Sequence, residues 1–238
     1  MKNYDLLPYI LMCQLAYNDN VEATQFADDA ISAEFLSIGN TQLYLVEALT
    51  EFVVVIRGTE WNELKDIKAS LHVWPERDYS IGWIKQGYLS EANRAVYALR
   101  ESRLKHRLKD SSKRLVITGH SLGGAIAQIA AARILNFGWA TPLCITFGAP
   151  SVVVWAKRGL KRVDHVRVTN ACDVVPRLGI ISTHTEHEHV FIADNKLHYN
   201  PNVLMHKWHV FKGSLSAPFN IVKDHYTQSY VDALKSTQ

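Results

Sequence analysis

The pentapeptide GHSLG at residues 119–123 constrains the fold of this chain more than any other feature of the sequence. It follows a short β-branched run at 114–119 (RLVITG), which is typical of a buried strand. It leads directly into residues 122–136 (LGGAIAQIAAARILN), which have a helical pattern with small residues on one side. The pattern G-x-S-x-G between a strand and a helix is typical of a tight turn that exposes a serine hydroxyl at the edge of a sheet. The sequence therefore predicts Ser121 as a nucleophile.

The glycines of this motif have a physical reason. A tight strand-to-helix turn strains the backbone and brings the helix close to the strand, so side chains at Gly119 and Gly123 would collide with it. The helix N-terminus places a positive partial charge beside the serine, and the backbone N–H of Leu122 becomes a natural donor to an oxyanion. The alternative interpretation is that Ser121 only caps a glycine-rich helix.

The order of elements along the chain predicts an α/β fold. Residues 51–57 (EFVVVIR) are apolar enough for a strand that is buried on both faces. The other expected strands are 41–49, 143–148 and 163–169, and the other expected helices are 86–109, 151–158 and 225–235. Strands that alternate with helices indicate a central, mostly parallel sheet flanked by helices. Ligands of such sheets bind beyond the carboxyl ends of the strands, where Ser121 is expected to lie.

A serine nucleophile needs a base that accepts its proton and an acid that orients the base. In folds with this serine turn, the acid follows the nucleophile along the chain and the histidine comes last. Asp173 is the expected acid, because it comes shortly after strand 163–169, where the chain turns away from the sheet. Asp164 starts that strand and therefore belongs to the opposite edge of the sheet. Asp194, which stands next to Asn195 in an expected turn, is a weaker alternative.

The base is expected near the C-terminus. The chain has eleven histidines, so counting alone leaves the assignment open. His225 is the best placed, because it stands at the start of the last expected helix and follows both Ser121 and Asp173. His206 and His209 are the alternatives.

Composition and charge exclude several classes of protein. The 238 residues are 47% hydrophobic and contain no repeat or linker, so we expect one domain over 1–238. A net charge of +3 is too small to indicate binding to nucleic acid. No apolar run reaches the roughly 18 residues of a membrane-spanning helix, so no transmembrane segment is expected. The first residues have one lysine followed by Asp5, and Pro8, Cys13 and Gln14 break the apolar run, so no leader is evident. This favours the cytoplasm or export without a leader, and a chain whose leader has been removed is the alternative.

Cysteines and clustered histidines also have structural interpretations. Cys13, Cys144 and Cys172 have apolar or strand-like neighbours and are expected to be small buried side chains. The histidines between 184 and 189 alternate with other residues ahead of an apolar run at 190–192, which is typical of a polar strand face. We therefore expect no functional metal site, and the alternative is that the histidines and glutamates of this segment bind a metal ion.

The chain resembles the class 3 lipases, the fungal-type triacylglycerol lipase family, over roughly residues 10–235. The segments that carry the resemblance are 55–59 (VIRGT), 119–124 (GHSLGG), 173–178 (DVVPRL) and, more loosely, the stretch that begins at Asp224-His225. The resemblance implies the α/β-hydrolase fold with a catalytic triad of Ser121, Asp173 and His225, and it implies no cofactor.

The resemblance also implies an oxyanion contact from Thr59, the hydroxy residue after Arg-Gly, which would act together with the N–H of Leu122. Strand 51–57 is expected to end at the same edge of the sheet as Ser121, which agrees with this role. The alternative is that Thr59 caps a helix that begins near Trp61.

A lid within residues 60–85 is a further implication of the resemblance. Trp61, Leu64 and Leu71 fall on one helical face, as expected for an amphipathic segment over an acyl site. Such a segment would open in transient contact with a lipid interface. The alternative is an ordinary core helix followed by a turn at Pro75.

The expected activity is hydrolysis of lipid esters through an acyl-enzyme on Ser121. Within enzymes, the alternatives are a short-chain carboxylesterase and a phospholipase or galactolipase. A catalytically silent α/β-hydrolase that serves as a binding module is the non-enzymatic alternative. Candidates for an acyl channel, from composition, are Val174, Leu178, Leu204, Met205 and Phe219.

Overall fold

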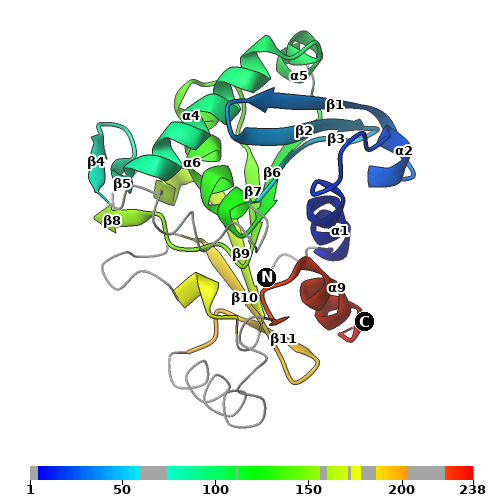
Figure 1. Ribbon diagram of the computed structural model, residues 1–238, viewed down its shortest axis with the longest axis vertical. Coiled ribbons are helices and arrows are strands. Elements are labelled where there is room, and N and C mark those ends of the chain that lie inside the picture. The colour runs from blue at the N-terminus through cyan, green and yellow to red at the C-terminus, as the bar shows by residue number, and fades with distance from the viewer. Residues whose placement is uncertain are drawn as a thin grey trace.

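A twisted central sheet with helices on both faces organises the computed structural model (Figure 1). The structure describes residues 5–58, 74–110, 112–155, 160–170, 173–177, 186–202 and 223–237. Within these ranges the main sheet has eight strands in the order β1-β2-β3-β6-β7-β9-β10-β11. Their bounds are β1 Ala30–Ile38, β2 Thr41–Ala48, β3 Glu51–Ile56, β6 Arg114–His120, β7 Leu143–Phe147, β9 Asp164–Asn170, β10 Glu188–Ala193 and β11 Lys196–Tyr199.

The middle of the sheet is parallel, as the sequence predicts. Strands β3, β6, β7, β9 and β10 pair in parallel, whereas β1, β2 and β11 join the edges in antiparallel fashion. The pairing of Ile56 with Gly119 and of His120 with Phe147 brings the carboxyl ends of β3, β6 and β7 to one edge. The serine turn that follows β6 therefore lies at this edge.

Side chains of the central strands alternate between two apolar cores, one on each face of the sheet. On β3, Phe52, Val54 and Ile56 belong to one core, while Val53 and Val55 belong to the other. This alternation follows from the two-residue period of a strand and explains why the run is apolar throughout.

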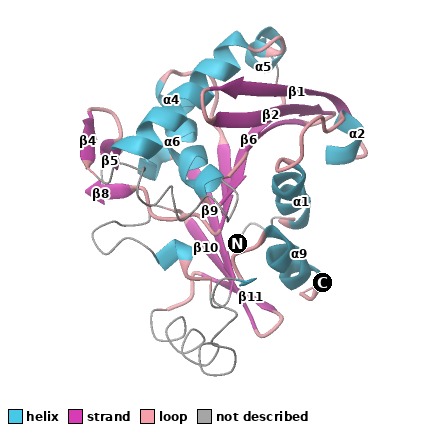
Figure 2. Ribbon diagram, in the orientation of Figure 1, coloured by secondary structure: helices cyan, strands magenta, loops and turns pink. Residues whose placement is uncertain are grey.

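Helices cover both cores (Figure 2). On one face α4 (Gln86–Glu101) packs against α6 (Leu122–Asn136), and on the other α1 (Leu7–Leu15) packs against α9 (Thr227–Lys235). The short α2 (Ala23–Phe26) lies against β1. The predicted helices at 122–136 and 225–235 are confirmed, the second with a start at residue 227. In the described part of the chain, no helix has the length and apolar character that a membrane crossing requires.

Two predicted helices differ from the structure. The helix expected at 86–109 is interrupted after Glu101 and resumes as α5 (Lys105–Asp110). The interruption has a long-range cause, because the buried carboxylate of Glu34 on β1 accepts hydrogen bonds from the Ser102 hydroxyl at 2.6 Å and the Arg103 N–H at 3.1 Å.

The helix expected at 151–158 is wrong for its first part, because Val153–Trp155 form strand β8. This strand pairs with β5 (Gly82–Lys85), which forms a hairpin with β4 (Pro75–Asp78), and the three make a small second sheet. The β-branched valines suit a strand, and the partner strand stands far away in the sequence, so local pattern could not reveal the pairing.

The same hairpin occupies the second half of the segment in which a lid is expected. Ile81 and Ile84 are fully buried in the core beside α4, and Pro75 starts an edge strand rather than a turn. The first half of the segment, residues 60–73, lies outside the described residues.

Candidate active site

Ser121 lies on a strained turn between β6 and α6. Its backbone has φ 57° and ψ −127°, a left-handed conformation that costs a non-glycine residue on the order of 1–3 kcal/mol. Its N–H donates to the carbonyl of Phe147 on β7 at 2.9 Å, and its own carbonyl accepts from Gly124 N–H at 3.0 Å. These bonds hold the turn in the strained form.

The glycines of the motif allow this turn to pack. A Cβ on Gly119 would lie 2.4 Å from the backbone of Gly123, and a Cβ on Gly123 would lie 2.2 Å from the carbonyl oxygen of Ile56. Real Cβ atoms do not approach other atoms so closely, so the predicted collisions are confirmed. Because Gly123 also approaches Arg57 and Gly58, the end of β3 lies directly beside the serine turn.

Of the two predicted oxyanion donors, Leu122 is among the described residues and Thr59 is not. Leu122 is the first residue of α6, so its N–H has no carbonyl one turn earlier in the helix. Thr59 lies outside the described residues, but its predecessor Gly58 lies against Gly123 at the same edge.

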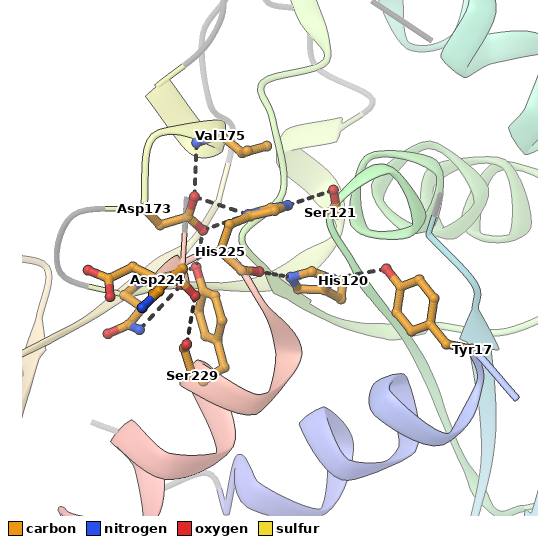
Figure 3. Close-up of polar contacts among 11 residues, drawn as sticks. Tyr17, His120, Ser121, Asp173, Val175, Asp224, His225 and Ser229 are labelled. Atoms are coloured by element: carbon orange, nitrogen blue, oxygen red, sulfur yellow. Dashed lines mark hydrogen bonds and ion pairs between the residues drawn. The ribbon is translucent and has the colours of Figure 1, made fainter. Parts of the chain in front are cut away.

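Ser121, His225 and Asp173 form one hydrogen-bonded chain (Figure 3). The Ser121 hydroxyl and Nε2 of His225 are 2.8 Å apart, and Nδ1 of His225 lies 2.9 Å and 3.0 Å from the two carboxylate oxygens of Asp173. All three residues are almost fully buried. The structure therefore brings together three residues from different parts of the chain, which the sequence predicts as nucleophile, base and acid.

The Asp173 carboxylate is fixed by two further donors. The hydroxyl of Tyr230 on α9 donates to Oδ2 at 2.6 Å, and the N–H of Val175 donates to Oδ1 at 2.9 Å. Burial and the neighbouring Asp173 carboxylate raise the pKa of Tyr230 well above its usual value of 10.0, so this phenol remains a donor. Hydrogen bonds and the imidazole thus hold the carboxylate in a single orientation.

Gly148, which follows β7, brings the chain close to this pair. Its φ of 58° favours glycine, and a Cβ there would lie 2.8 Å from Oδ2 of Asp173 and 3.1 Å from the His225 ring.

His120 also belongs to this site, although the motif does not single it out, because it fills the variable position of G-x-S-x-G. Its buried ring lies 4.7 Å, centre to centre, from the ring of His225. Its Nε2 lies 2.6 Å from the carbonyl oxygen of His225, and its Nδ1 lies 3.1 Å from the Tyr17 hydroxyl. Burial and then the neighbouring His225 hold the pKa of His120 well below 6.5, so this ring is neutral at pH 7.

Asp173, rather than either alternative acid, takes the position beside Nδ1 of His225. Asp164 begins β9 and pairs with Leu143 at the start of β7, which is the opposite edge of the sheet. Asp194 lies in the tight turn between β10 and β11 with φ 50°. The alternative bases, His206 and His209, fall outside the described residues.

The other candidate residues have ordinary surroundings where the structure describes them. Cys13 and Cys144 are free and buried, as predicted, and Cys172 is outside the described residues. In the clustered-histidine segment, His187 lies against the Lys161 carbonyl and His189 lies 2.7 Å from the Thr169 hydroxyl. Across the described ranges, no group of three or more His, Cys, Asp or Glu side chains is arranged to hold a metal ion.

Of the acyl-channel candidates, Val174 is next to Asp173 and partly buried. The remaining four, Leu178, Leu204, Met205 and Phe219, lie outside the described residues.

Comparison with known proteins finds a matching family and a curated relative. A family model described as Lipase (class 3) matches residues 53–183. Among curated proteins, Phospholipase A(1) DAD1, chloroplastic, from Arabidopsis thaliana is 29% identical over 167 residues, which are 59% of this chain and 36% of that protein. The chain thus spans about a third of the length of this relative.

Solved structures of fungal lipases have a similar fold. A lipase from Rhizopus microsporus var. chinensis has a TM-score of 0.67 at 18% identity, with 92% of this chain and 82% of that chain covered. The triacylglyceride lipase of Rhizomucor miehei has a TM-score of 0.65 at 19% identity, with 80% of each chain covered.

Proposed function

Because the chain belongs to the class 3 lipase family and has its α/β-hydrolase fold, we propose that it is a serine hydrolase that cleaves the carboxylic esters of lipids. The observation that carries the proposal is the buried chain of hydrogen bonds from Ser121 through His225 to Asp173. A hydroxyl, an imidazole and a carboxylate in this order form the apparatus of acyl transfer.

In the proposed reaction, Nε2 of His225 accepts the Ser121 proton as the serine oxygen attacks the ester carbonyl. The N–H of Leu122, together with Thr59, stabilises the oxyanion that forms on the carbonyl oxygen. Asp173 holds the imidazole with Nε2 toward the serine and stabilises its protonated form. The imidazolium then donates its proton to the departing alcohol, and an acyl group remains on Ser121.

Hydrolysis of this acyl-enzyme completes the cycle. A water molecule gives a proton to His225 and attacks the acyl carbonyl, and collapse of the second tetrahedral intermediate returns the proton to Ser121 and releases the fatty acid. Apart from the substrate and water, these steps use only side chains and backbone groups of the protein, so the proposed reaction needs no cofactor.

The substrate class rests on the family rather than on the triad, because a triad accepts many esters. A triacylglycerol is the first candidate, since the similar solved structure from Rhizomucor miehei is named a triacylglyceride lipase. A phospholipid is the second, since the curated relative is named a phospholipase.

The proposal is tested with a series of esters of increasing acyl length, together with a triacylglycerol and a phosphatidylcholine, each assayed with wild type and with Ser121→Ala. The wild type is expected to hydrolyse long-chain esters, and Ser121→Ala is expected to lose this activity. Hydrolysis of short esters alone would favour a carboxylesterase. A folded wild type that hydrolyses none of these esters would favour the silent binding module.

The lid within 60–85 and the single-domain organisation stay predictions. A lid that opens at a lipid surface would make the rate rise sharply where the substrate passes its solubility limit. A smooth hyperbolic rate curve through that limit would count against it.

A further inference from the structure

The base of the proposed triad stands on a short turn rather than within a helix or strand. Residues 223–226 lead into α9, and His225 lies in their middle. A turn of this kind can move as a unit unless its peptide groups are held. Since a displacement of about 1 Å in an active site can lower a rate by roughly 100-fold, the groups that hold this turn bear on catalysis.

Side chains from three separate elements hold consecutive carbonyls of this turn (Figure 3). The Ser229 hydroxyl of α9 donates to the Lys223 carbonyl at 2.6 Å. The Asn170 amide at the end of β9 donates to the Asp224 carbonyl at 3.4 Å. His120, at the end of β6, lies 2.6 Å from the carbonyl oxygen of His225 itself.

The bond from His120 differs from the other two, because His120 immediately precedes Ser121. The chain therefore closes a small ring of contacts. The Ser121 hydroxyl contacts Nε2 of His225 at 2.8 Å, and the carbonyl oxygen of the same histidine contacts Nε2 of His120 at 2.6 Å. The peptide bond between His120 and Ser121 completes the ring. The residue directly before Ser121 thus fixes the position of the His225 backbone, and with it the position of the His225 imidazole.

Chemistry fixes the direction of the hydrogen bonds at His120. A carbonyl oxygen only accepts, so Nε2 of His120 carries the proton and donates to His225. Nδ1 of the neutral ring is then an acceptor, and the Tyr17 hydroxyl donates to it at 3.1 Å. The rings of Tyr17 and Tyr230 also pack edge-on against His120, at 6.2 Å and 5.9 Å between centroids.

Tyr17 also contacts the residues that follow β3. Its hydroxyl packs so closely against Gly58 that a Cβ on that glycine would lie only 2.4 Å from it. The Arg57 guanidinium lies 6.0 Å from the centre of the Tyr17 ring. The end of β3, Tyr17, His120 and His225 therefore form one contiguous set of contacts.

We propose that His120 is a positioning residue, which Tyr17 holds in one tautomer and which sets the distance between the Ser121 hydroxyl and the His225 imidazole through the His225 carbonyl. The proposal rests on the proposed function, because it concerns the same site. His120 touches neither the substrate nor the reacting atoms, so it acts only through His225.

A matched pair of variants separates the hydrogen bond from packing. His120→Leu removes the donor. His120→Gln retains one, because the glutamine amide nitrogen stands the same number of bonds from Cβ as Nε2 does. For a monomeric ester, His120→Leu is expected to lower kcat by about 10- to 100-fold with KM within about twofold of wild type, whereas His120→Gln stays within about threefold in kcat. Wild-type kcat in the leucine variant, or an equal loss in both variants, would overturn the proposal.

Tyr17→Phe supplies a second test that does not depend on a core substitution. Alone, it is expected to lower kcat by about three- to tenfold, because His120 loses the donor that fixes its tautomer. In the His120→Leu background it is expected to have no further effect, since Tyr17 acts through His120. An unchanged kcat in the single variant, or independent effects in the double variant, would contradict the proposal.

A readout without substrate distinguishes this proposal from the proposed function. The proton between Nδ1 of His225 and Asp173 is expected to give a sharp low-field NMR resonance in wild type and in His120→Gln, and a broadened or shifted one in His120→Leu. If wild type hydrolyses no ester, the proposed function fails, and this resonance still tests the positioning. An identical sharp resonance in the leucine variant would overturn the positioning role alone.

Discussion

Tyr230→Phe removes the buried hydroxyl that supports Asp173 and leaves the ring in place. That hydroxyl donates to Oδ2 of Asp173 at 2.6 Å and accepts from the N–H of Asn170 at 3.1 Å, and the side chain has no exposed surface. A hydrogen bond to a charged group contributes about 1.5–3 kcal/mol, and a buried donor that loses its partner costs about 1–3 kcal/mol. Because the variant suffers both losses, we expect the free energy of unfolding to fall by about 3–4 kcal/mol.

Urea and thermal unfolding measure this change directly. For a chain of this length, each kcal/mol lowers the melting temperature by about 2–4 °C, so a fall of roughly 10 °C is expected. The catalytic effect is expected to be smaller, about tenfold or less in kcat, because Val175 and His225 still hold the Asp173 carboxylate.

Tyr97→Phe is the matched control. Tyr97 is 55% exposed on α4, so its variant is expected to stay within about 0.5 kcal/mol of wild type. A loss below about 1 kcal/mol in Tyr230→Phe, or equal losses in the two variants, would refute the reasoning about the buried hydroxyl.

The site supports three further predictions. His225→Ala is expected to lower kcat by about 10⁴-fold or more while the circular dichroism spectrum stays native, and near-normal ester hydrolysis would move the base to His206 or His209. Gly123→Ala is expected to destabilise the chain by about 3 kcal/mol or more, because its Cβ would lie 2.2 Å from the Ile56 carbonyl oxygen; a wild-type unfolding midpoint would contradict this. Because the pKa of buried His120 lies well below 6.5, only the unfolded chain gains a proton as the pH falls below that value. The free energy of unfolding is therefore expected to fall by up to about 1.4 kcal/mol per pH unit there, with a shallower slope in His120→Gln; equal slopes between about pH 5 and 6.5 would argue against it.

The central fold could be predicted because its strands are buried on both faces. The runs at 51–57, 114–119 and 143–148 are short, rich in β-branched residues and largely apolar, and such runs are typical of the middle strands of a parallel sheet. The break after Glu101 and the strand at Val153–Trp155 could not be predicted, because both depend on distant partners. Glu34 binds Ser102 at the break, and β5 pairs with the strand at Val153–Trp155, so neither feature leaves a signal in its own stretch of sequence.

The site residues differ in how far the sequence alone could identify them. Ser121 has a local signature in its glycines, and Asp173 follows from its place after a strand. His225 depended on chain order among eleven histidines, so its contact with Asp173 adds what the sequence lacked. His120 was overlooked because its position in the motif accepts many residues, although a histidine beside the nucleophile was the available signal. Tyr230 stands in the segment after His225 that loosely resembles the family, but its bond to Asp173 forms only when α9 packs against β9 and could not be predicted from that spacing.

The central claim is that Ser121 is a nucleophile activated by His225. Its most direct test is the intact mass of the folded protein after reaction with a p-nitrophenyl phosphonate ester, followed by peptide mapping. Wild type is expected to gain one adduct, located on Ser121, while Ser121→Ala gains none and His225→Ala reacts far more slowly. A folded wild type without an adduct, or an adduct that persists in Ser121→Ala, would contradict the account.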